Sequence, residues 1–408
     1  MTGYAHFTLL FTPIGVHPAA AGLGAAPTGF ADWIAGARTA ERGGIDAIFI
    51  ADAPTAALEG AATIKFEPVT LLTALARETT SIGLIGTAST SFGEPYNVAR
   101  QFASLQLLSD GRAGWNSVGT SHPGAAENFG DAEWHDHARR YRVGHEFTGV
   151  VRELWRAGQR PIRHRGEFFS VDGPLDIDLA GTVPPVICQA GGSEAGIRLA
   201  AEHADLTFAV LPDLAAALAY RARISEAEES RRAGGSVRVL PGVVPYLADT
   251  EAEARAYKAR LDAAVDLRAA LPVIARYLHV DAAVLGALAP DEPFPLELLP
   301  APDQVGNSVA TYTSLHTVIT GGAMTTREVL LKASGGNRHR EFVGTAEAFA
   351  ADIDRWLRAD GADGFTLLLP ATARDLPYFS DRVAPVLRGA GLLPAQPATG
   401  PLRERFAG

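Results

Sequence analysis

The sequence contains one cysteine, Cys188, among its 408 residues, so it cannot form an internal disulfide. Cys188 ends the apolar run Val186-Ile-Cys188, which indicates a buried thiol rather than a nucleophile. No apolar run approaches the roughly 18 residues that a membrane-spanning helix requires, so no membrane association is expected. The amino terminus lacks a basic patch followed by a long apolar stretch. We therefore expect a cytoplasmic location.

Concentrated positive charge is also missing. The formal net charge is −10, and the arginines are scattered along the chain rather than gathered in one stripe. Binding to a phosphate backbone needs clustered positive charge, so we expect no nucleic-acid partner. A small-molecule substrate fits this composition better.

Short apolar runs alternate with helical stretches, and the runs end in small or polar residues. This alternation predicts a parallel sheet. Eight strands, each followed by a helix, predict a (β/α)₈ TIM barrel rather than a doubly wound sheet. The expected strands are residues 5–11, 45–51, 81–87, 112–118, 184–190, 205–210, 236–246 and 363–369. The expected helices are residues 30–42, 68–78, 96–108, 137–157, 194–202, 213–232, 345–359 and 376–389.

Two stretches interrupt the alternation. Residues 158–183 are rich in Gly and Pro, which predicts a long ordered loop or a small hairpin. Residues 249–344 predict a mostly helical insertion between strand seven and the last helices, and we expect it to cover the barrel mouth as a lid. Residues 1–390 are thus expected to form one barrel domain. The Pro-containing residues 391–408 predict an extended tail that is poorly ordered or lies along a neighbour.

Polar residues stand at the ends of several predicted strands. Asp52 ends the second strand, Thr87 and Thr90 follow the third, and Asn116 lies near the end of the fourth. Barrel enzymes place their chemistry at the carboxyl ends of the strands, so these side chains are expected to converge on one cavity. A glycosidase would instead need two facing carboxylates, and the fourth strand supplies no acid.

The segment Gly191-Gly-Ser193-Glu194 follows the fifth strand and begins a helix. Its backbone amides and the helix dipole could hold a phosphate. A tight turn with Ser193 as the helix cap is an equally good explanation. Ala195 breaks the Gly-x-Ser-x-Gly pattern, which excludes the nucleophile elbow of α/β-hydrolases.

Three residues of the predicted helix 137–157 share one face, because His137, Tyr141 and His145 are spaced i, i+4 and i+8. The first two are nearest the barrel mouth and could hydrogen-bond a ligand. Alternatively, Tyr141 and His145 simply pack against the barrel wall. His135 and His137 diverge on a helix, so we expect no metal site.

Several motifs occur in order along almost the whole chain. They read EPYNVARQFASL at residues 94–105, SDGRAGWN at 109–116, PGAAENFG at 123–130, HARRY at 137–141, QAGGSEAG at 189–196 and FVGT at 342–345. Together they resemble the bacterial-luciferase-like flavin monooxygenases. Within that family they resemble the branch of nitrilotriacetate, dibenzothiophene-sulfone and pristinamycin-type monooxygenases.

The resemblance implies FMN at the barrel mouth. It further implies that reduced FMN (FMNH₂) reacts with O₂ to a C4a-(hydro)peroxyflavin, which oxidises a small organic substrate that the sequence does not identify. His137 would hold or protonate this intermediate, and Tyr141 would orient it. Ser193 and Glu194 would lie at the phosphate end of the cofactor. The residues implied around the flavin ring and ribityl chain are Asp52, Thr87 or Thr90, Asn116, His137 and Tyr141.

The same resemblance implies two kinds of partner. A separate NAD(P)H:FMN reductase would supply the reduced cofactor, and helices two and three would form a homodimer or a dimer of dimers. Two other functions fit the fold: a deazaflavin (F420)-dependent dehydrogenase and a non-catalytic flavin-binding protein. The substrate is expected to be selected by the short Ala- and Gly-rich segment 12–30 and by the insertion 249–344.

Overall fold

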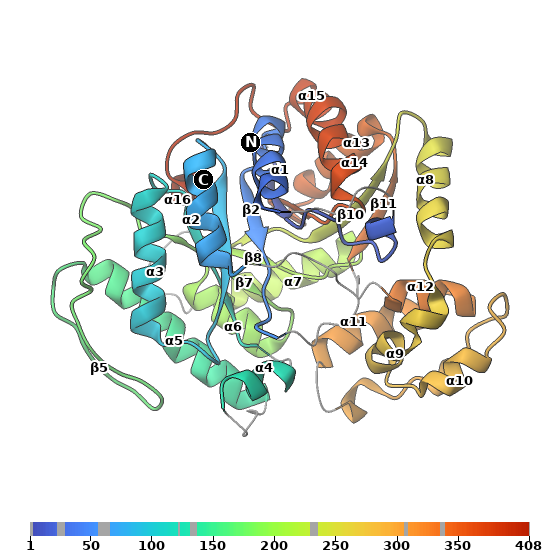
Figure 1. The fold of residues 1–408 in the computed structure, drawn as a ribbon, viewed down its shortest axis with the longest axis horizontal. Helices are drawn as coiled ribbons and strands as arrows, with labels where there is room; N and C mark the ends of the chain where they lie inside the picture. Colours follow the sequence, from blue (N-terminus) through green and yellow to red (C-terminus); the bar gives the residue numbers. More distant parts are fainter. Residues whose placement is uncertain are drawn as a thin grey trace.

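Helices surround a curled sheet of parallel strands in the computed structural model (Figure 1). The structure describes residues 3–22, 29–55, 66–120, 123–130, 137–228, 236–305, 309–334 and 339–407. Within these residues the sheet consists of β1 (His6–Leu10), β2 (Ala47–Ile50), β3 (Gly83–Ser89), β4 (Ala113–Val118), β7 (Val186–Ala190), β8 (Leu206–Phe208), β9 (Arg238–Val239), β10 (Gly242–Leu247), β11 (Arg340–Gly344) and β12 (Gly364–Leu367). Their spatial order is β11-β10-β12-β1-β2-β3-β4-β7-β8-β9.

The outer face of the sheet is covered by helices. Strands such as β2 and β10 are buried along their whole length, as expected for parallel strands covered on both faces. Predicted and observed helices agree closely, except that the last one is divided by a π-helical turn at Phe379–Val383. The covering helices are α1 (Phe30–Gly43), α2 (Pro68–Glu78), α3 (Pro95–Leu108), α5 (His137–Ala157), α6 (Glu194–His203), α7 (Leu214–Glu228), α13 (Ala346–Arg358), α14 (Thr372–Tyr378) and α15 (Ala384–Gly389). The short α4 (Pro123–Asn128), which was not predicted, follows β4 and precedes α5.

Alternate residues of each strand face opposite sides of the sheet. On β4, Trp115 is fully buried on the outer side, where its ring meets those of Phe147 and Trp155 on α5. The inner side holds a separate apolar cluster. Its buried members are Ala47, Phe49, Ile85, Val186, Cys188, Leu206, Leu240, Leu402 and Phe406. The expectation that the Cys188 thiol is buried is confirmed, and this burial raises the pKa of the thiol.

The prediction of an extended tail is wrong for its last residues, which form α16 (Leu402–Phe406). Leu402 and Phe406 enter the inner cluster at the amino ends of the strands. A Cβ on Gly83 would lie 2.5 Å from Leu402 Cδ1, so the glycine at the start of β3 makes room for α16. Arg403 pairs with Asp205 just before β8. The apolar residues of α16 span only one turn beside Pro and Gly, too little for the sequence to indicate a helix.

The predicted strand 236–246 is divided into β9 and β10, because Pro241 lacks the N–H that a continuous ladder needs. The residues between β9 and β10 form backbone hydrogen bonds to a neighbouring strand on each side. The N–H of Leu240 donates to the Thr207 carbonyl of β8 over 2.9 Å, and the N–H of Thr366 in β12 donates to the Pro241 carbonyl over 3.0 Å.

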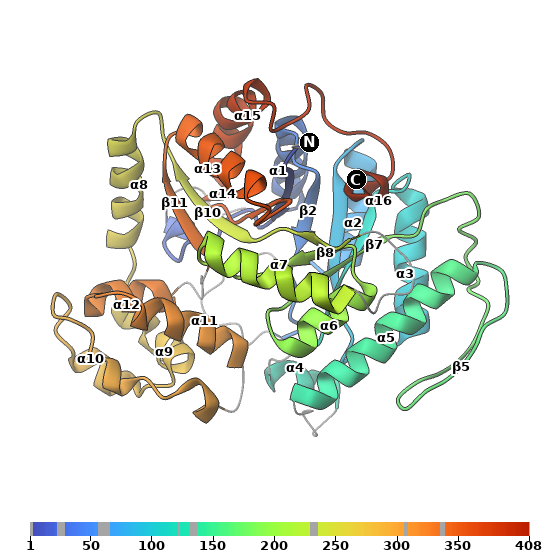
Figure 2. The same cartoon turned by 180° about the vertical axis from the view of Figure 1, so that it is seen from behind.

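The insertion is mostly helical, as predicted. Its helices are α8 (Glu251–Ala263), α9 (Leu267–Leu278), α10 (Ala282–Ala287), α11 (Val309–Thr320) and α12 (Thr326–Ser334). Helices α9 to α12 surround an apolar cluster of their own and lie to one side of the sheet in both views (Figure 2). The insertion also contains β11, which the sequence analysis missed. Arg340 and Glu341 give this segment a polar sequence that does not indicate a buried strand. In the structure Arg340 pairs with Asp352 at 2.7 Å, and Glu341 pairs with Lys332 at 3.2 Å.

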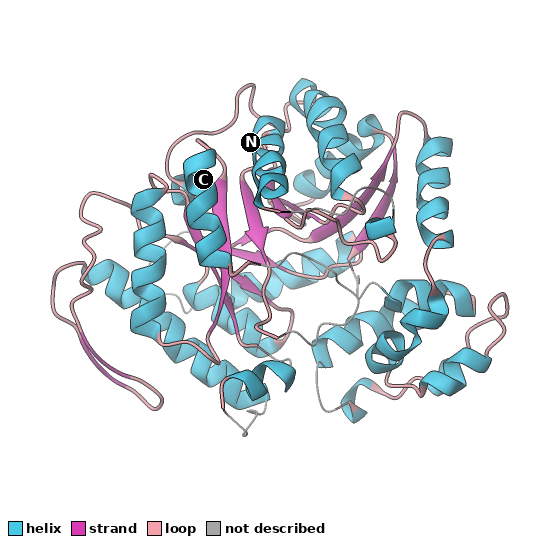
Figure 3. Ribbon diagram, viewed as in Figure 1, coloured by secondary structure: helices cyan, strands magenta, loops and turns pink. Residues whose placement is uncertain are grey.

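A small antiparallel hairpin of β5 (Arg163–Arg165) and β6 (Ser170–Asp172) confirms the interpretation of residues 158–183. It protrudes at the end of the molecule opposite α10 (Figure 3). Among the described helices, none has the length and apolar character needed to cross a membrane.

Candidate active site

A cavity of about 960 Å³ runs along α5 and α6, and a second of about 880 Å³ opens at the carboxyl ends of β7 and β8. The second lies where barrel enzymes place their chemistry. Its walls combine the β7–α6 loop, the end of β8, α7 and one helix of the insertion, α11. The lining residues include Gly191, Gly192, Ser193, Phe208, Tyr220, Arg223, Thr313, Ser314 and His339, with His137 shared by both cavities.

The first turn of α6 is fixed to α5 by a short hydrogen-bond chain. Ser193 caps the helix, since its Oγ accepts the Gly196 N–H at 3.1 Å, and the same hydroxyl donates to Tyr141 Oη at 3.0 Å. The Tyr141 ring lies 4.8 Å from the exposed His137 ring. The structure thus brings together the predicted site residues His137, Tyr141 and Ser193. His137 and Ser193 are more than 50 positions apart in the sequence.

The loop before α6 is held from the other side by α7. Tyr220 Oη donates to the Gly191 carbonyl at 3.0 Å. Burial raises the pKa of Tyr220 to about 12, so this hydroxyl remains a donor at neutral pH. The backbone amides at the start of α6 are therefore fixed beside the cavity, where a helix amino terminus suits an anion.

Glu194, the first residue of α6, is paired with two arginines. Its carboxylate accepts a hydrogen bond from Arg223 at 2.8 Å and pairs with Arg198 at 3.4 Å. These contacts lower the pKa of Glu194 and keep its carboxylate ionised; the hydrogen bond from Arg223 has the largest effect and that from Arg198 the next largest. Arg223 lines the cavity, and Glu194 is its hydrogen-bond partner. Arg223 was not among the predicted site residues, because nothing in the Ala-rich stretch 214–228 distinguishes it from a surface arginine.

Asn116 and Thr87 are paired on adjacent strands. Asn116 Nδ2 donates to Thr87 Oγ1 at 2.9 Å, and both side chains are buried. Asn116 Oδ1 and Gln189 Oε1 are buried and receive no hydrogen bond from the described residues. Buried acceptors in folded proteins nearly always have a donor, so these two atoms fit the N–H groups of a bound ligand. Gln189 was not among the predicted site residues.

The remaining predicted positions, Thr90 and Asp52, are not among the residues that line either cavity. Thr90 is buried, its Oγ1 lies 3.4 Å from the Val118 carbonyl, and a Cβ on Gly144 of α5 would approach it to 3.3 Å. It therefore faces α5, whereas Thr87 faces Asn116. Asp52 is half-buried directly after β2.

An aromatic pair forms another wall that sequence analysis missed. The Phe208 and His339 rings stack with centroids 4.9 Å apart and an interplanar angle of 18°. A Cβ on Gly242 would lie 2.1 Å from His339 Nδ1, so only glycine leaves space for this ring. Such a flat surface suits a planar ligand. His339 follows a Gly-rich stretch, and no local pattern marked it.

Comparison with known proteins assigns the family. Residues 7–292 match the model described as luciferase-like monooxygenase. The chain is 34% identical to the N-acetyl-S-(2-succino)cysteine monooxygenase of Bacillus subtilis (strain 168), over 91% of this chain and 88% of the relative. The chain belongs to the luciferase-like monooxygenase family.

Further relatives confirm the branch that the motifs indicate. Nitrilotriacetate monooxygenase component A of Aminobacter aminovorans is 34% identical over 90% of this chain and 88% of its own length. The structure of the EDTA monooxygenase from Chelativorans sp. BNC1 superimposes with a TM-score of 0.80 at 31% identity, covering 99% of this chain and 98% of that one. This luciferase-like monooxygenase is therefore a flavin-dependent enzyme, and its curled parallel sheet matches the TIM-barrel-like fold of its relatives.

Proposed function

We propose that the protein is the oxygenase component of a two-component system. It binds reduced FMN supplied by a separate NAD(P)H:FMN reductase and uses O₂ to oxidise a small organic substrate. The observation that carries the proposal is the cavity at the ends of β7 and β8, where the α6 amino terminus, Arg223 and a flat aromatic wall converge. The name of the Aminobacter relative, component A, supports the separate reductase.

The residues present fit FMN. Arg223 and the amides at the start of α6 would hold its phosphate, since both favour anions. The unpaired acceptors Asn116 Oδ1 and Gln189 Oε1 would receive N–H groups of the flavin ring. When bound, reduced flavin supplies the two electrons with which one oxygen atom leaves as water while the other enters the substrate.

His137 is our candidate for proton transfer at this cavity, and Tyr141 is its positioning partner. The two rings are in contact at the start of α5, and Ser193 fixes the Tyr141 hydroxyl. Helix α11 contributes Thr313 and Ser314 to the wall, which supports the insertion 249–344 as the lid that excludes water.

We further propose that the sheet closes as a (β/α)₈ barrel within residues 1–390. The segment 238–243 bonds to β8 on one side and to β12 on the other, which supports closure through a single bent strand. In this description β11 is an additional strand beside β10.

The decisive experiment is oxygenation with the reductase, NADH, FMN and a panel of organosulfur and amine compounds. We expect O₂ uptake matched by a product that gains one atom from ¹⁸O₂. Substrate oxidation without O₂ when a deazaflavin is supplied would instead indicate a dehydrogenase. Tight flavin binding without turnover of any compound would favour a non-catalytic flavin-binding protein.

Arg223→Ala is expected to weaken FMN binding by about 10- to 100-fold, because a hydrogen bond to a charged group contributes about 1.5–3 kcal/mol. Riboflavin, which lacks the phosphate, should bind wild type and variant alike. Fluorescence titrations with FMN and with riboflavin distinguish a loss of phosphate binding from a general loss of flavin binding. Arg198→Ala is the matched control, since Arg198 also pairs with Glu194 but does not line the cavity. Equal losses for FMN and riboflavin would contradict the phosphate assignment.

We also propose a homodimer or a dimer of dimers through α2 and α3. Leu107 and Leu108 at the end of α3 are 43% and 47% exposed, which supports a covered surface there. Light scattering coupled to gel filtration should give twice or four times the 42.9 kDa chain mass. Leu107→Glu with Leu108→Glu should shift the protein to monomer, and a wild-type monomer would refute the proposal.

A further inference from the structure

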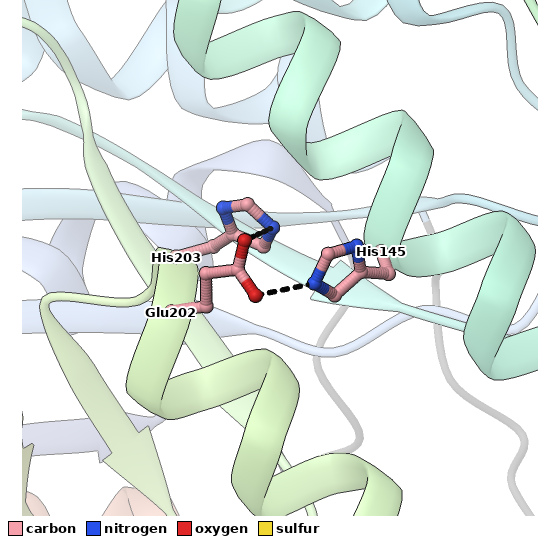
Figure 4. A group of neighbouring side chains, drawn as sticks. All are labelled: His145, Glu202 and His203. Atoms are coloured by element: carbon pink, nitrogen blue, oxygen red, sulfur yellow. Dashed lines mark hydrogen bonds and ion pairs between the residues drawn. The ribbon is translucent and has the colours of Figure 1, made fainter. Parts of the chain in front are cut away.

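The second histidine of α5, His145, belongs to a cluster that the flavin chemistry does not use. It faces the last turn of α6, which carries Glu202 and His203 (Figure 4). His145 Nε2 lies 2.6 Å from Glu202 Oε2, and His203 Nε2 lies 3.8 Å from Glu202 Oε1. One nitrogen from each ring and one carboxylate oxygen all lie within 4.8 Å of one another.

We propose that His145, Glu202 and His203 bind one divalent first-row transition-metal ion of the Zn²⁺ type. Two imidazoles and a carboxylate are a ligand set that such ions accept. Around a tetrahedral ion with bonds of about 2.0–2.1 Å, ligand atoms are about 3.3 Å apart. The observed separations lie on either side of this value, so small rotations of the side chains bring all three groups to one ion.

The surroundings allow an ion to enter and to be hydrated. The cluster opens into the 960 Å³ groove along α5 and α6. The side chains of His145 and Glu202 are 45% and 54% exposed, whereas His203 is 9% exposed. His203 thus offers a fixed ligand at the base, the other two adjust, and water completes the coordination. Glu146 and Glu153 also line the groove and add negative charge to it.

This site is separate from the candidate flavin cavity. His145 is two helical turns beyond His137, about 12 Å along α5. The sequence indicated no metal because it offered only His135, which lies outside the described residues, and His137 as neighbouring ligands. The proposed ligands come from two helices, and His145 and Glu202 are 57 positions apart in the sequence. A search for ligands spaced along one helix therefore does not find them.

A bound ion would connect α5 to α6. The Arg152 guanidinium already donates to the Glu202 carbonyl at 2.5 Å, so the two helices are aligned at this point before any ion binds. The ion would then strengthen the contact between the helices whose first turns carry Tyr141 and Ser193. Metal binding at this cluster does not depend on a bound flavin, because none of the three ligands lines the cavity at the strand ends.

The test uses the full chain, purified without a histidine tag and freed of metal by a chelator. Titration with Zn²⁺ in a calorimeter should show one ion per chain, and Co²⁺ should give the visible absorption of a nitrogen- and oxygen-ligated ion. His145→Gln should weaken binding at least about tenfold. This position is exposed enough for the variant to fold, and circular dichroism checks that it does. At saturating Zn²⁺ the wild type should melt about 2–3 °C higher, and His145→Gln should not.

His164→Gln is the matched control. His164 lines the same groove and bonds to Glu146 at 3.0 Å, but it is outside the cluster. Its loss should leave Zn²⁺ affinity unchanged. Absence of a one-to-one Zn²⁺ complex, or equal affinities for wild type and His145→Gln, would overturn the proposal and leave the cluster as a hydrogen-bonded contact between helices.

Discussion

His137→Ala is expected to lower the rate of coupled substrate oxidation by about 10²- to 10⁴-fold, the usual contribution of a positioned acid or base. His137 is the first residue of α5, its ring contacts Tyr141, and it lines the cavity at the strand ends. Because its side chain is exposed, the truncation should cost little folding free energy. The loss should therefore appear in chemistry rather than in the amount of folded protein.

The measurement compares three quantities in one reaction: product formed, NADH consumed and H₂O₂ released. In the His137→Ala variant, NADH consumption should continue while product falls and H₂O₂ rises, because oxygen is reduced without being transferred. His164→Ala should behave as wild type, because His164 lines the groove along α5 but not the cavity at the strand ends. Product formation at the wild-type rate with no additional H₂O₂ would show that His137 has no such role.

Tyr141→Phe separates orientation from proton transfer. The variant keeps the ring against His137 but loses the oxygen that accepts the Ser193 hydroxyl at 3.0 Å. We expect a smaller effect than for His137→Ala, because the ring contact remains.

The strands and most helices could be predicted because each is specified by its own residues. Parallel strands buried on both faces are continuous apolar runs, and the βα alternation follows from them. The exceptions depend on distant partners. Strand β11 is charged at Arg340 and Glu341, and only the folded chain places Asp352 and Lys332 beside them. Helix α16 is one turn long and is stabilised by the strand ends it covers.

The candidate site shows the same division. His137 and Tyr141 were recognisable from their spacing on one helix, and Ser193 from its position between a strand and a helix. Arg223 and the Phe208–His339 pair were not, because each reaches the cavity from an element with no local polar pattern. Glu194 was predicted at the phosphate end, and its hydrogen bond to Arg223 is a contact that the sequence did not indicate.

A family motif does not by itself identify residues of the active site. In SDGRAGWN, residues 109–116, Asn116 pairs with Thr87 of β3, whereas its neighbour Trp115 packs against α5. Asp110 and Gly111 have positive φ angles of 53° and 87° and form the turn into β4. The Gly111 carbonyl accepts the Leu402 N–H at 2.9 Å, so the same turn also seats α16.

Arg112 provides the strongest test of this structural role. It is 4% exposed, and its guanidinium donates to the carbonyls of Ser109, Ile82, Ala76 and Thr79 and to Thr79 Oγ1, at 2.7 to 3.2 Å. One side chain thus joins the ends of α2 and α3 to the starts of β3 and β4. Burial lowers the pKa of Arg112, but a guanidinium with so many partners remains protonated at neutral pH.

Arg112→Ala should lower the free energy of unfolding by about 3–5 kcal/mol, because several buried carbonyls lose their donor together. For a chain of this size the melting temperature should fall by about 4–6 °C. Arg100→Ala is the control, since Arg100 is 45% exposed and forms one ion pair with Asp176 at 2.8 Å. An exposed pair contributes below about 1 kcal/mol, so this variant should melt with the wild type. Arg112→Lys should remain destabilised. An ammonium has three donors, so it cannot bond to five acceptors that are arranged around a planar guanidinium. If Arg112→Ala instead melted with the wild type while FMN binding was lost, the motif would belong to the cofactor site rather than to the frame that supports it.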